Sequence, residues 1–202
     1  MIPLLGSMVK PLVIASWNIN GRYLTDKFKN KIDKVKYVIE WAITNEVDIV
    51  CLQETHSAGD GDIQSRVNDH HIIFESHNNS SSTGVATIFI NYKSIKAIAA
   101  DSIKQVCTDH ELIRYKQTGN DINGRILHLE FKYNDKVYNI INLYCPATGK
   151  VERELFFKCH KNQWVGKEHM IMCGDFNTVV NDFDSTKTYT PDEMISNNIE
   201  FD

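Results

Sequence analysis

Three features of the sequence predict an α/β fold. Short apolar runs that suit buried strands, such as residues 13–17 and 47–54, alternate with segments of helical period. Residues 125–144 alternate apolar and polar positions on both sides of Asn134-Asp135, a pair suited to a tight turn, which predicts a β-hairpin. The 202 residues suffice for one domain with a sizeable core.

A helix is predicted after the first strand. The residues Phe28, Ile32, Val35, Ile39 and Ala42 recur at spacings of four and three, so a helix would present them on one face. The lysines of KFKNKIDKVK fall mainly on the other face, and a solvated helix face explains them better than a nucleic-acid patch. Further strands are predicted at 71–76, 83–90 and 169–177, a short helix at 62–67 and a longer helix at 151–166.

Composition excludes several classes of protein. A net charge of −4 argues against binding of nucleic acid by a bulk positive field. The five cysteines are scattered and form no CxxC pair, so we expect neither a disulfide framework nor a zinc site, and a reducing compartment fits best. Residues 1–8 are too short an apolar run for a signal peptide or a membrane span. We expect them to be a tag or flexible terminus before one domain at 9–202, with no membrane partner.

Four polar clusters follow predicted strands, at residues 18–22, 53–56, 142–146 and 174–177. If the strands lie in packed sheets with these ends facing one way, the clusters converge on a single rim. Carboxylate and carboxamide oxygens suit Mg²⁺, with Mn²⁺ as a substitute, far better than zinc. The sequence therefore predicts phosphate-ester chemistry at a metal site.

The motifs around these clusters resemble a known family. SWNINGR, DIVCLQETH, GVATIFI, NGRILHLEF, INLYCPATG and GDFNTVVNDFDS occur in the order seen in the endonuclease/exonuclease/phosphatase superfamily. The Trp-Asn-Ile-Asn-Gly form and the histidine after Gln-Glu-Thr resemble LINE-type (non-LTR) retrotransposon endonucleases, relatives of the apurinic/apyrimidinic (AP) endonucleases. The resemblance implies a DNase I-like fold, a four-layer α/β sandwich of two packed mixed sheets flanked by helices.

The resemblance also implies a function and a set of site residues. It implies a Mg²⁺-dependent endonuclease that nicks DNA to leave a 3′-hydroxyl, in the nucleus or the cytoplasm. Glu54 would be the main metal carboxylate, with Asn18 as a second ligand or as its orienter. Asp175 would orient or deprotonate the attacking water, Asn177 would donate a hydrogen bond to the water or phosphate, and Tyr144 would support the phosphate or the leaving oxygen.

Structural explanations compete for some of these residues. Asn18 and Asn177 singly suit turns or caps, and Tyr144 suits an ordinary strand. Glu54 and Asp175 are harder to explain structurally, because a carboxylate after an apolar strand is costly to bury unless it is paired or metal-bound.

Two arginines are candidates for binding the substrate. Arg22 and Arg125 each suit a phosphate contact, because a guanidinium binds a phosphate in two places at once. A surface salt bridge explains each of them equally well.

The sequence departs from the family pattern after Asn177. Family members carry a further aspartate and a terminal Ser-Asp-His strand there, and no such motif follows Asn177 in this sequence. We therefore expect missing C-terminal strands, self-association through an incomplete sheet and impaired activity, since losing an acid–base partner costs about 10² to 10⁴ in rate. Two alternatives stay open: an inactive remnant that binds nucleic acid or a protein partner, and another superfamily phosphatase or phosphodiesterase.

Overall fold

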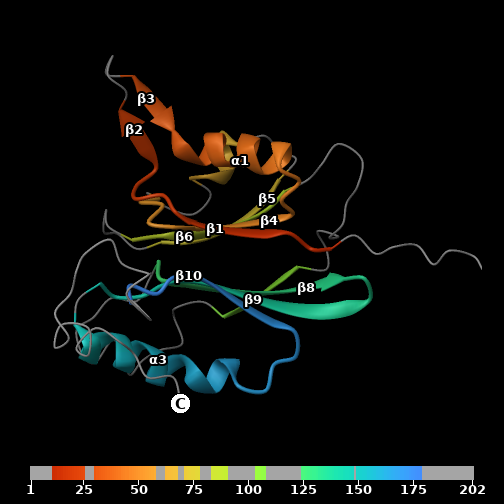
Figure 1. Ribbon diagram of the computed structural model, residues 1–202, viewed down its shortest axis with the longest axis vertical. Coiled ribbons are helices and arrows are strands. Elements are labelled where there is room, and N and C mark those ends of the chain that lie inside the picture. Colours follow the sequence, from red (N-terminus) through yellow and green to blue (C-terminus); the bar gives the residue numbers. More distant parts are fainter. Residues whose placement is uncertain are drawn as a thin grey trace, which may run out of the picture.

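A computed structural model describes residues 11–25, 30–57, 62–67, 71–77, 83–90, 103–107, 124–147 and 149–178. Its strands are β1 (Ile14–Asn18), β2 (Tyr23–Thr25), β3 (Lys31–Asp33), β4 (Ile49–Gln53), β5 (Ile72–Ser76), β6 (Val85–Phe89), β7 (Lys104–Cys107), β8 (Ile126–Tyr133), β9 (Lys136–Tyr144) and β10 (Met170–Asp175). Its helices are α1 (Lys34–Thr44), α3 (Lys150–Trp164) and the 3₁₀ turn η1 (Gln64–Arg66). Helix α1, one sheet, a second sheet and helix α3 follow one another as four layers (Figure 1), which confirms the predicted sandwich.

The two packed sheets are built alike. The first has the strand order β1-β4-β6-β5 and the second has the order β10-β9-β8-β7. In each, the first pair is parallel and the other two pairs are antiparallel. We call them the first and second sheets. The parallel pairs β1–β4 and β10–β9 bring four strand ends to one rim.

Three apolar cores fill the spaces between the four layers. Alternation along β4 shows why: Val50 and Leu52 pack toward α1, whereas Ile49 and Cys51 face the second sheet. The space between the sheets also holds Leu129, Phe131 and Ile140, and the space under α3 holds Ile141, Leu143 and Phe156. Because the first sheet is covered on both faces, its central strands β4 and β6 are buried along their whole length and almost continuously apolar.

The predicted helix begins later than its apolar period suggested. Residues Lys31–Asp33 form β3, which pairs with β2 so that Ile32 lies opposite Leu24. The Asp33 carboxylate then accepts a hydrogen bond from the Val35 N–H at 3.0 Å and begins α1. Ile32 is therefore a hairpin residue and not part of the helix face, because hairpin pairing and the aspartate cap override the helical period there. Phe28 lies outside the described residues.

Most other predicted elements are confirmed. Asn134 and Asp135 form the hairpin turn with φ of 50° and 62°, the left-handed values that a tight hairpin turn requires. Strand β7 was not predicted. Two predictions fall outside the described residues. They are the tag or flexible terminus at residues 1–8 and the missing strands after Thr178. No helix of the described part is long and apolar enough to cross a membrane.

Candidate active site

The site residues meet at the rim where β1, β4, β9 and β10 end. Asn18 is the last residue of β1, Glu54 follows β4, and Tyr144 and Asp175 end β9 and β10. The Asn18 Nδ2 atom donates to Glu54 Oε1 at 2.8 Å and to Asp175 Oδ2 at 2.7 Å. Since Glu54 belongs to the first sheet and Asp175 to the second, one side-chain amide joins carboxylates from both sheets.

Both ends of the Asn18 amide have partners. Its Oδ1 atom accepts a hydrogen bond from the Asn20 N–H at 2.9 Å, while its Nδ2 atom donates to the two carboxylates. In this structure Asn18 orients Glu54, and its role as a metal ligand stays a prediction.

Glu54 reaches the rim through a strained turn. Its φ is 52°, and His56 has a φ of 50°, left-handed values that cost of order 1–3 kcal/mol each for such residues. Backbone hydrogen bonds hold the turn: Gly21 N–H donates to the Glu54 carbonyl at 2.7 Å, and His56 N–H donates to the Thr83 carbonyl at 3.0 Å. The surrounding structure thus fixes the carboxylate in a conformation that a free chain would avoid.

The loop after β1 packs closely against this turn. Gly21 has a φ of 79°, and a Cβ atom there would lie 2.9 Å from His56 Nδ1, so only glycine fits. Lys34 donates from Nζ to the carbonyl of Asn20 at 2.8 Å and also to that of Ile19. Lys34 therefore holds the loop after β1, so its prediction as part of a solvated helix face was wrong. Nothing in a run of lysines indicates that one of them makes such a contact.

Tyr144 lies against Glu54. Burial, together with the charge of Glu54, raises the pKa of Tyr144 to about 12. The guanidinium of Arg125 covers its ring at 4.9 Å from the centroid and donates to the Tyr144 carbonyl at 3.3 Å. The structure therefore brings Tyr144 to the carboxylates as a neutral phenol, with Arg125 beside it.

Asn177 shapes the end of β10. Its backbone N–H donates to Asp175 Oδ1 at 2.9 Å, and its Nδ2 donates to the Cys145 carbonyl at 2.7 Å. These bonds hold a left-handed residue, φ 48°, that asparagine tolerates well. Asn177 thus fixes the orientation of Asp175, and its amide keeps one N–H for a further acceptor.

Arg22 does not lie on the rim. Its side chain is only 2% exposed and forms ion pairs with Asp33 at 3.1 Å and Asp62 at 2.9 Å. Burial, the largest single effect, lowers the pKa of Arg22, but the hydrogen bond and charge of Asp33 together with the charge of Asp62 outweigh it, so the pKa is raised. A guanidinium buried between two carboxylates has no free face for a phosphate, so the salt-bridge alternative describes Arg22. The two buried ion pairs tie the β1–β2 loop to the start of α1 and to the segment before η1.

The two carboxylates fit a hard divalent cation. Among the described residues, neither Glu54 nor Asp175 forms an ion pair with a lysine or an arginine, and His56 Nε2 lies 3.7 Å from Glu54 Oε2. The same part of the chain holds no group of three or more His, Cys, Asp or Glu side chains suited to a metal. The described residues therefore form no zinc-like cage, whereas Mg²⁺ commonly takes only one or two carboxylates and keeps several waters.

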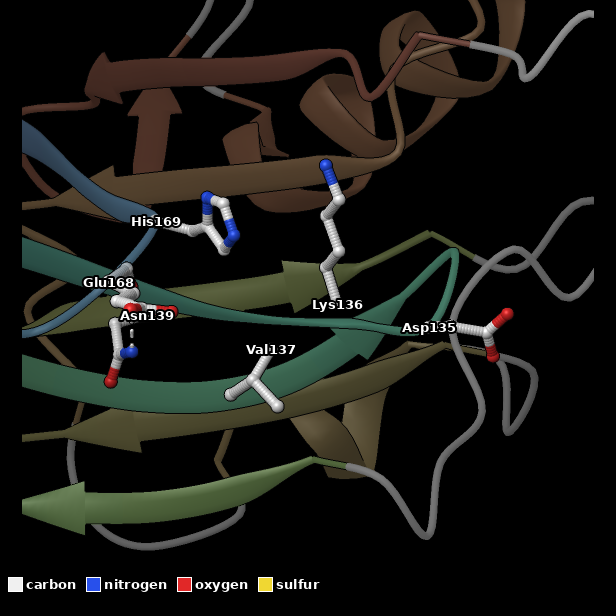
Figure 2. A pocket seen from close by; sticks show the side chains of 6 residues that line it. All are labelled: Asp135, Lys136, Val137, Asn139, Glu168 and His169. Atoms are coloured by element: carbon white, nitrogen blue, oxygen red, sulfur yellow. Dashed lines mark hydrogen bonds between the residues drawn. The ribbon is translucent and has the colours of Figure 1, made fainter.

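A pocket lies at the other end of the second sheet. It has a volume of about 420 Å³ and lies beside the β8–β9 turn, where Asp135, Lys136 and Val137 line it together with Asn139, Glu168 and His169 (Figure 2). Tyr144 ends the same strand that Lys136 begins, roughly 26 Å away at about 3.3 Å per residue. The pocket is therefore separate from the carboxylate rim.

Several solved structures with this architecture are named as endonucleases. The AP endonuclease LMAP from Leishmania major has a TM-score of 0.60 at 17% identity, covering 90% of this chain and 60% of that one. The endonuclease domain of TRAS1, a telomere-specific non-LTR retrotransposon, has a TM-score of 0.56 at 13% identity, covering 92% and 70%. The chain has the DNase I-like fold. An AP endonuclease from Archaeoglobus fulgidus shares the DNase I-like fold with a TM-score of 0.55 at 18% identity, covering 93% of this chain and 64% of that one.

One curated relative also matches in sequence. The transposon TX1 uncharacterized 149 kDa protein of Xenopus laevis is 29% identical over 129 residues, which are 62% of this chain. The match covers only 8% of that protein, so the chain spans a small part of the relative's length. No family model matches the chain. The neighbours confirm the predicted resemblance to LINE-type and AP endonucleases at the level of the DNase I-like fold.

Proposed function

We propose that this chain is a metal-dependent phosphodiesterase that nicks DNA and leaves a 3′-hydroxyl. The observation that supports the proposal most is the Asn18 amide shared between Glu54 and Asp175. One donor between two carboxylates from different sheets holds both acids at the same rim. Such a pair suits a reaction in which one acid holds a cation and the other handles a water.

Mg²⁺ is the proposed cofactor, with Mn²⁺ as a substitute, and Glu54 would hold it. When bound, the ion supplies Lewis-acid stabilisation to a phosphate oxygen. The contacts of Glu54 suit this role: Asn18 takes Oε1, and the left-handed turn keeps the side chain at the rim. Preorganisation of this kind matters because a ligand that is already oriented needs little rearrangement when charge develops.

Asp175 is the proposed acceptor of the proton from the attacking water. Asn18 binds its Oδ2 and the Asn177 N–H binds its Oδ1, so the carboxylate plane is fixed. Each carboxylate oxygen keeps a further lone pair, which a water can approach. Asn177, which shapes this turn, would place its remaining N–H toward the water or the phosphate.

Tyr144 and Arg125 are proposed to contact the phosphate or the leaving oxygen. Because burial and Glu54 raise the pKa of Tyr144 to about 12, the phenol keeps its proton at neutral pH and can donate it to an oxygen in a hydrogen bond. Arg125 stacks on that ring, which leaves its guanidinium edge for an anionic group.

DNA as substrate is supported by the neighbours. One neighbour is named as the endonuclease domain of a retrotransposon and others as AP endonucleases, and the sequence relative is a transposon protein. A mobile-element nuclease would act on nuclear DNA, with a cytoplasmic stage, which matches the reducing location expected from the cysteines.

Nicking of supercoiled plasmid tests the proposal. The unsubstituted chain is assayed with Mg²⁺ and with chelator, beside Glu54→Gln, Asp175→Asn and the control Glu154→Gln, a half-buried acid of α3 that pairs with Lys158. We expect Mg²⁺-dependent nicking by the unsubstituted chain and the control, and a loss of about a hundredfold or more in the two site variants. Direct extension of the nick by a DNA polymerase would show the 3′-hydroxyl.

Other outcomes would contradict the proposal in distinct ways. Equal nicking by all four proteins would remove the site assignment. Binding of DNA without nicking would favour the inactive binding module. Release of phosphate from a 3′-phosphorylated oligonucleotide without nicking would favour a phosphatase.

A further inference from the structure

A buried amide pair lies directly beneath the candidate site. Gln53 precedes Glu54 at the end of β4, and Asn142 lies two residues before Tyr144 in β9. The Gln53 Nε2 atom donates to Asn142 Oδ1 at 2.8 Å, and the two residues are 1% and 0% exposed. The bond crosses from the first sheet to the second.

The same two side chains reach further into the first sheet. Asn142 Nδ2 donates to the carbonyls of Leu52 at 3.1 Å and Ala86 at 2.9 Å. Gln53 Nε2 also approaches Ser16 Oγ at 3.1 Å. One buried pair therefore connects β9 of the second sheet with β1, β4 and β6 of the first.

The rest of the space between the sheets is mainly apolar, and apolar packing is not directional. Two apolar faces can shift relative to each other at little cost, whereas a buried hydrogen bond weakens steeply when its length or angle changes. The site residues are divided between the sheets, with Asn18 and Glu54 on one and Asp175 and Tyr144 on the other. A small shift of one sheet would therefore change every distance in the site that joins the two sheets, such as that from Asn18 to Asp175.

We propose that Gln53 and Asn142 are positioning residues, whose amide pair fixes the two sheets relative to each other and thereby sets the separation of Glu54 from Asp175. The kinetic part of this inference rests on the proposed function. The structural part does not, because the Asn18 contacts report the separation whether or not the chain cleaves DNA.

Two kinds of variant remove the amide pair. Gln53→Met keeps the length of the side chain and removes only its hydrogen bonds, and Gln53→Leu with Asn142→Leu makes both positions apolar. Ile140→Ala is the matched control, since Ile140 is buried between the same sheets and contributes only apolar packing. Gln53→Asn with Asn142→Gln restores an amide pair of the same total length.

Two measurements report positioning. The first is the ¹⁵N–¹H resonance of the Asn18 side-chain amide, assigned by its loss in Asn18→Asp. The second is the Mg²⁺ concentration for half-maximal nicking, together with the rate at saturating Mg²⁺. Supporting shells around metal ligands commonly contribute ten- to hundredfold in affinity or rate, so we expect changes of about that size in both amide-free variants. Their Asn18 resonance should move toward that of a solvent-exposed asparagine, and the exchanged pair should recover part of each effect.

Three outcomes would overturn the inference. The first is an unchanged Asn18 resonance in folded Gln53→Met, which is the gentler variant should the double leucine variant fail to fold. The second is an unchanged Mg²⁺ requirement in that variant. The third is an equal effect from Ile140→Ala, which would assign positioning to packing in general. If the unsubstituted chain does not nick DNA, the proposed function fails, and the Asn18 resonance still decides the positioning.

Discussion

The two spaces beside the second sheet bury polar side chains in opposite ways. Between the sheets, the amides of Gln53 and Asn142 bond each other and backbone carbonyls. Beneath α3, His160 Nε2, Trp164 Nε1 and His128 Nδ1 have no hydrogen-bond partner among the described residues. A buried polar group with partners costs little and fixes geometry, whereas one without partners bears its desolvation cost. We infer that the space between the sheets positions the site residues. The space beneath α3 instead makes the free energy of unfolding depend on pH.

The desolvation cost beneath α3 appears as lowered pKa values of the two histidines. Burial lowers the pKa of His160 to about 4, although its Nδ1 bonds the Phe156 carbonyl. Burial also lowers the pKa of His128, whose Nε2 lies 3.0 Å from Asn139 Oδ1. His160 stacks on Trp164 with ring centroids 5.5 Å apart, so a charged imidazolium there would lie in an apolar stack.

Phe131→Ala removes apolar packing from the space between the sheets without touching its amides. Of the substitutions considered, it should lower the free energy of unfolding most. Phe131 is fully buried and its ring lies 5.5 Å from Phe89 and 5.7 Å from Tyr138. Removing a buried phenylalanine typically lowers the free energy of unfolding by about 3–5 kcal/mol. Urea denaturation measures the loss. Nicking per folded molecule should not change, and a large fall in it would contradict the separation of packing from positioning.

Acidification tests the space beneath α3. Between pH 6.5 and about 4 the unfolded chain protonates His160 while the folded chain does not, so the free energy of unfolding should fall as the pH drops through this window. The full effect is of order 3 kcal/mol. In His160→Leu this part of the pH dependence should vanish, as measured by urea denaturation at pH 7, 6, 5 and 4.5. The exposed His169→Asn is the control and should keep it; equal curves for all three proteins would contradict the assignment.

Tyr144→Phe should have the smallest effect, because it removes one hydroxyl from the rim and no packing. We expect a loss of about tenfold in nicking rate, near the 1.4 kcal/mol that one hydrogen bond contributes. Since the Tyr144 pKa is raised to about 12, the unsubstituted chain should lose no activity through this group between pH 7 and 10. A pH–rate profile of both proteins measures this. An alkaline loss below pH 10 that disappears in Tyr144→Phe would contradict the neutral phenol.

The meeting of the two carboxylates at one rim could be predicted, because its sequence signals are local. Glu54 and Asp175 each lie at the end of an apolar strand, where a carboxylate is costly to bury unless it has a partner. The structure brings both to Asn18. Arg22 could not be assigned from sequence, because its partners Asp33 and Asp62 lie 11 and 40 residues away and only folding brings them together. The same limit hid the role of Asn142, whose acceptors Leu52 and Ala86 are distant in the chain.

The fold divides in the same way. The hairpin around Asn134 was predictable, since its alternation and its turn residues lie within one short segment. The start of α1 was not, because Ile32 fits the helical period and pairing with Leu24 decides its conformation. The layered arrangement came from the resemblance, because strand order depends on pairings such as β10 with β9 that no local pattern records.

The separation of Asn18 from Asp175 has a consequence for the biogenesis of this chain. The two residues lie 157 positions apart, at opposite ends of the described sequence. During synthesis the first sheet can form early, and it carries Asn18 and Glu54 alone. Long-range pairing of this kind forms slowly and late. A ribosome-bound or prematurely terminated product that lacks β10 would therefore carry half of the carboxylate pair, and the complete pair would arise only in chains that have been made and folded through β10.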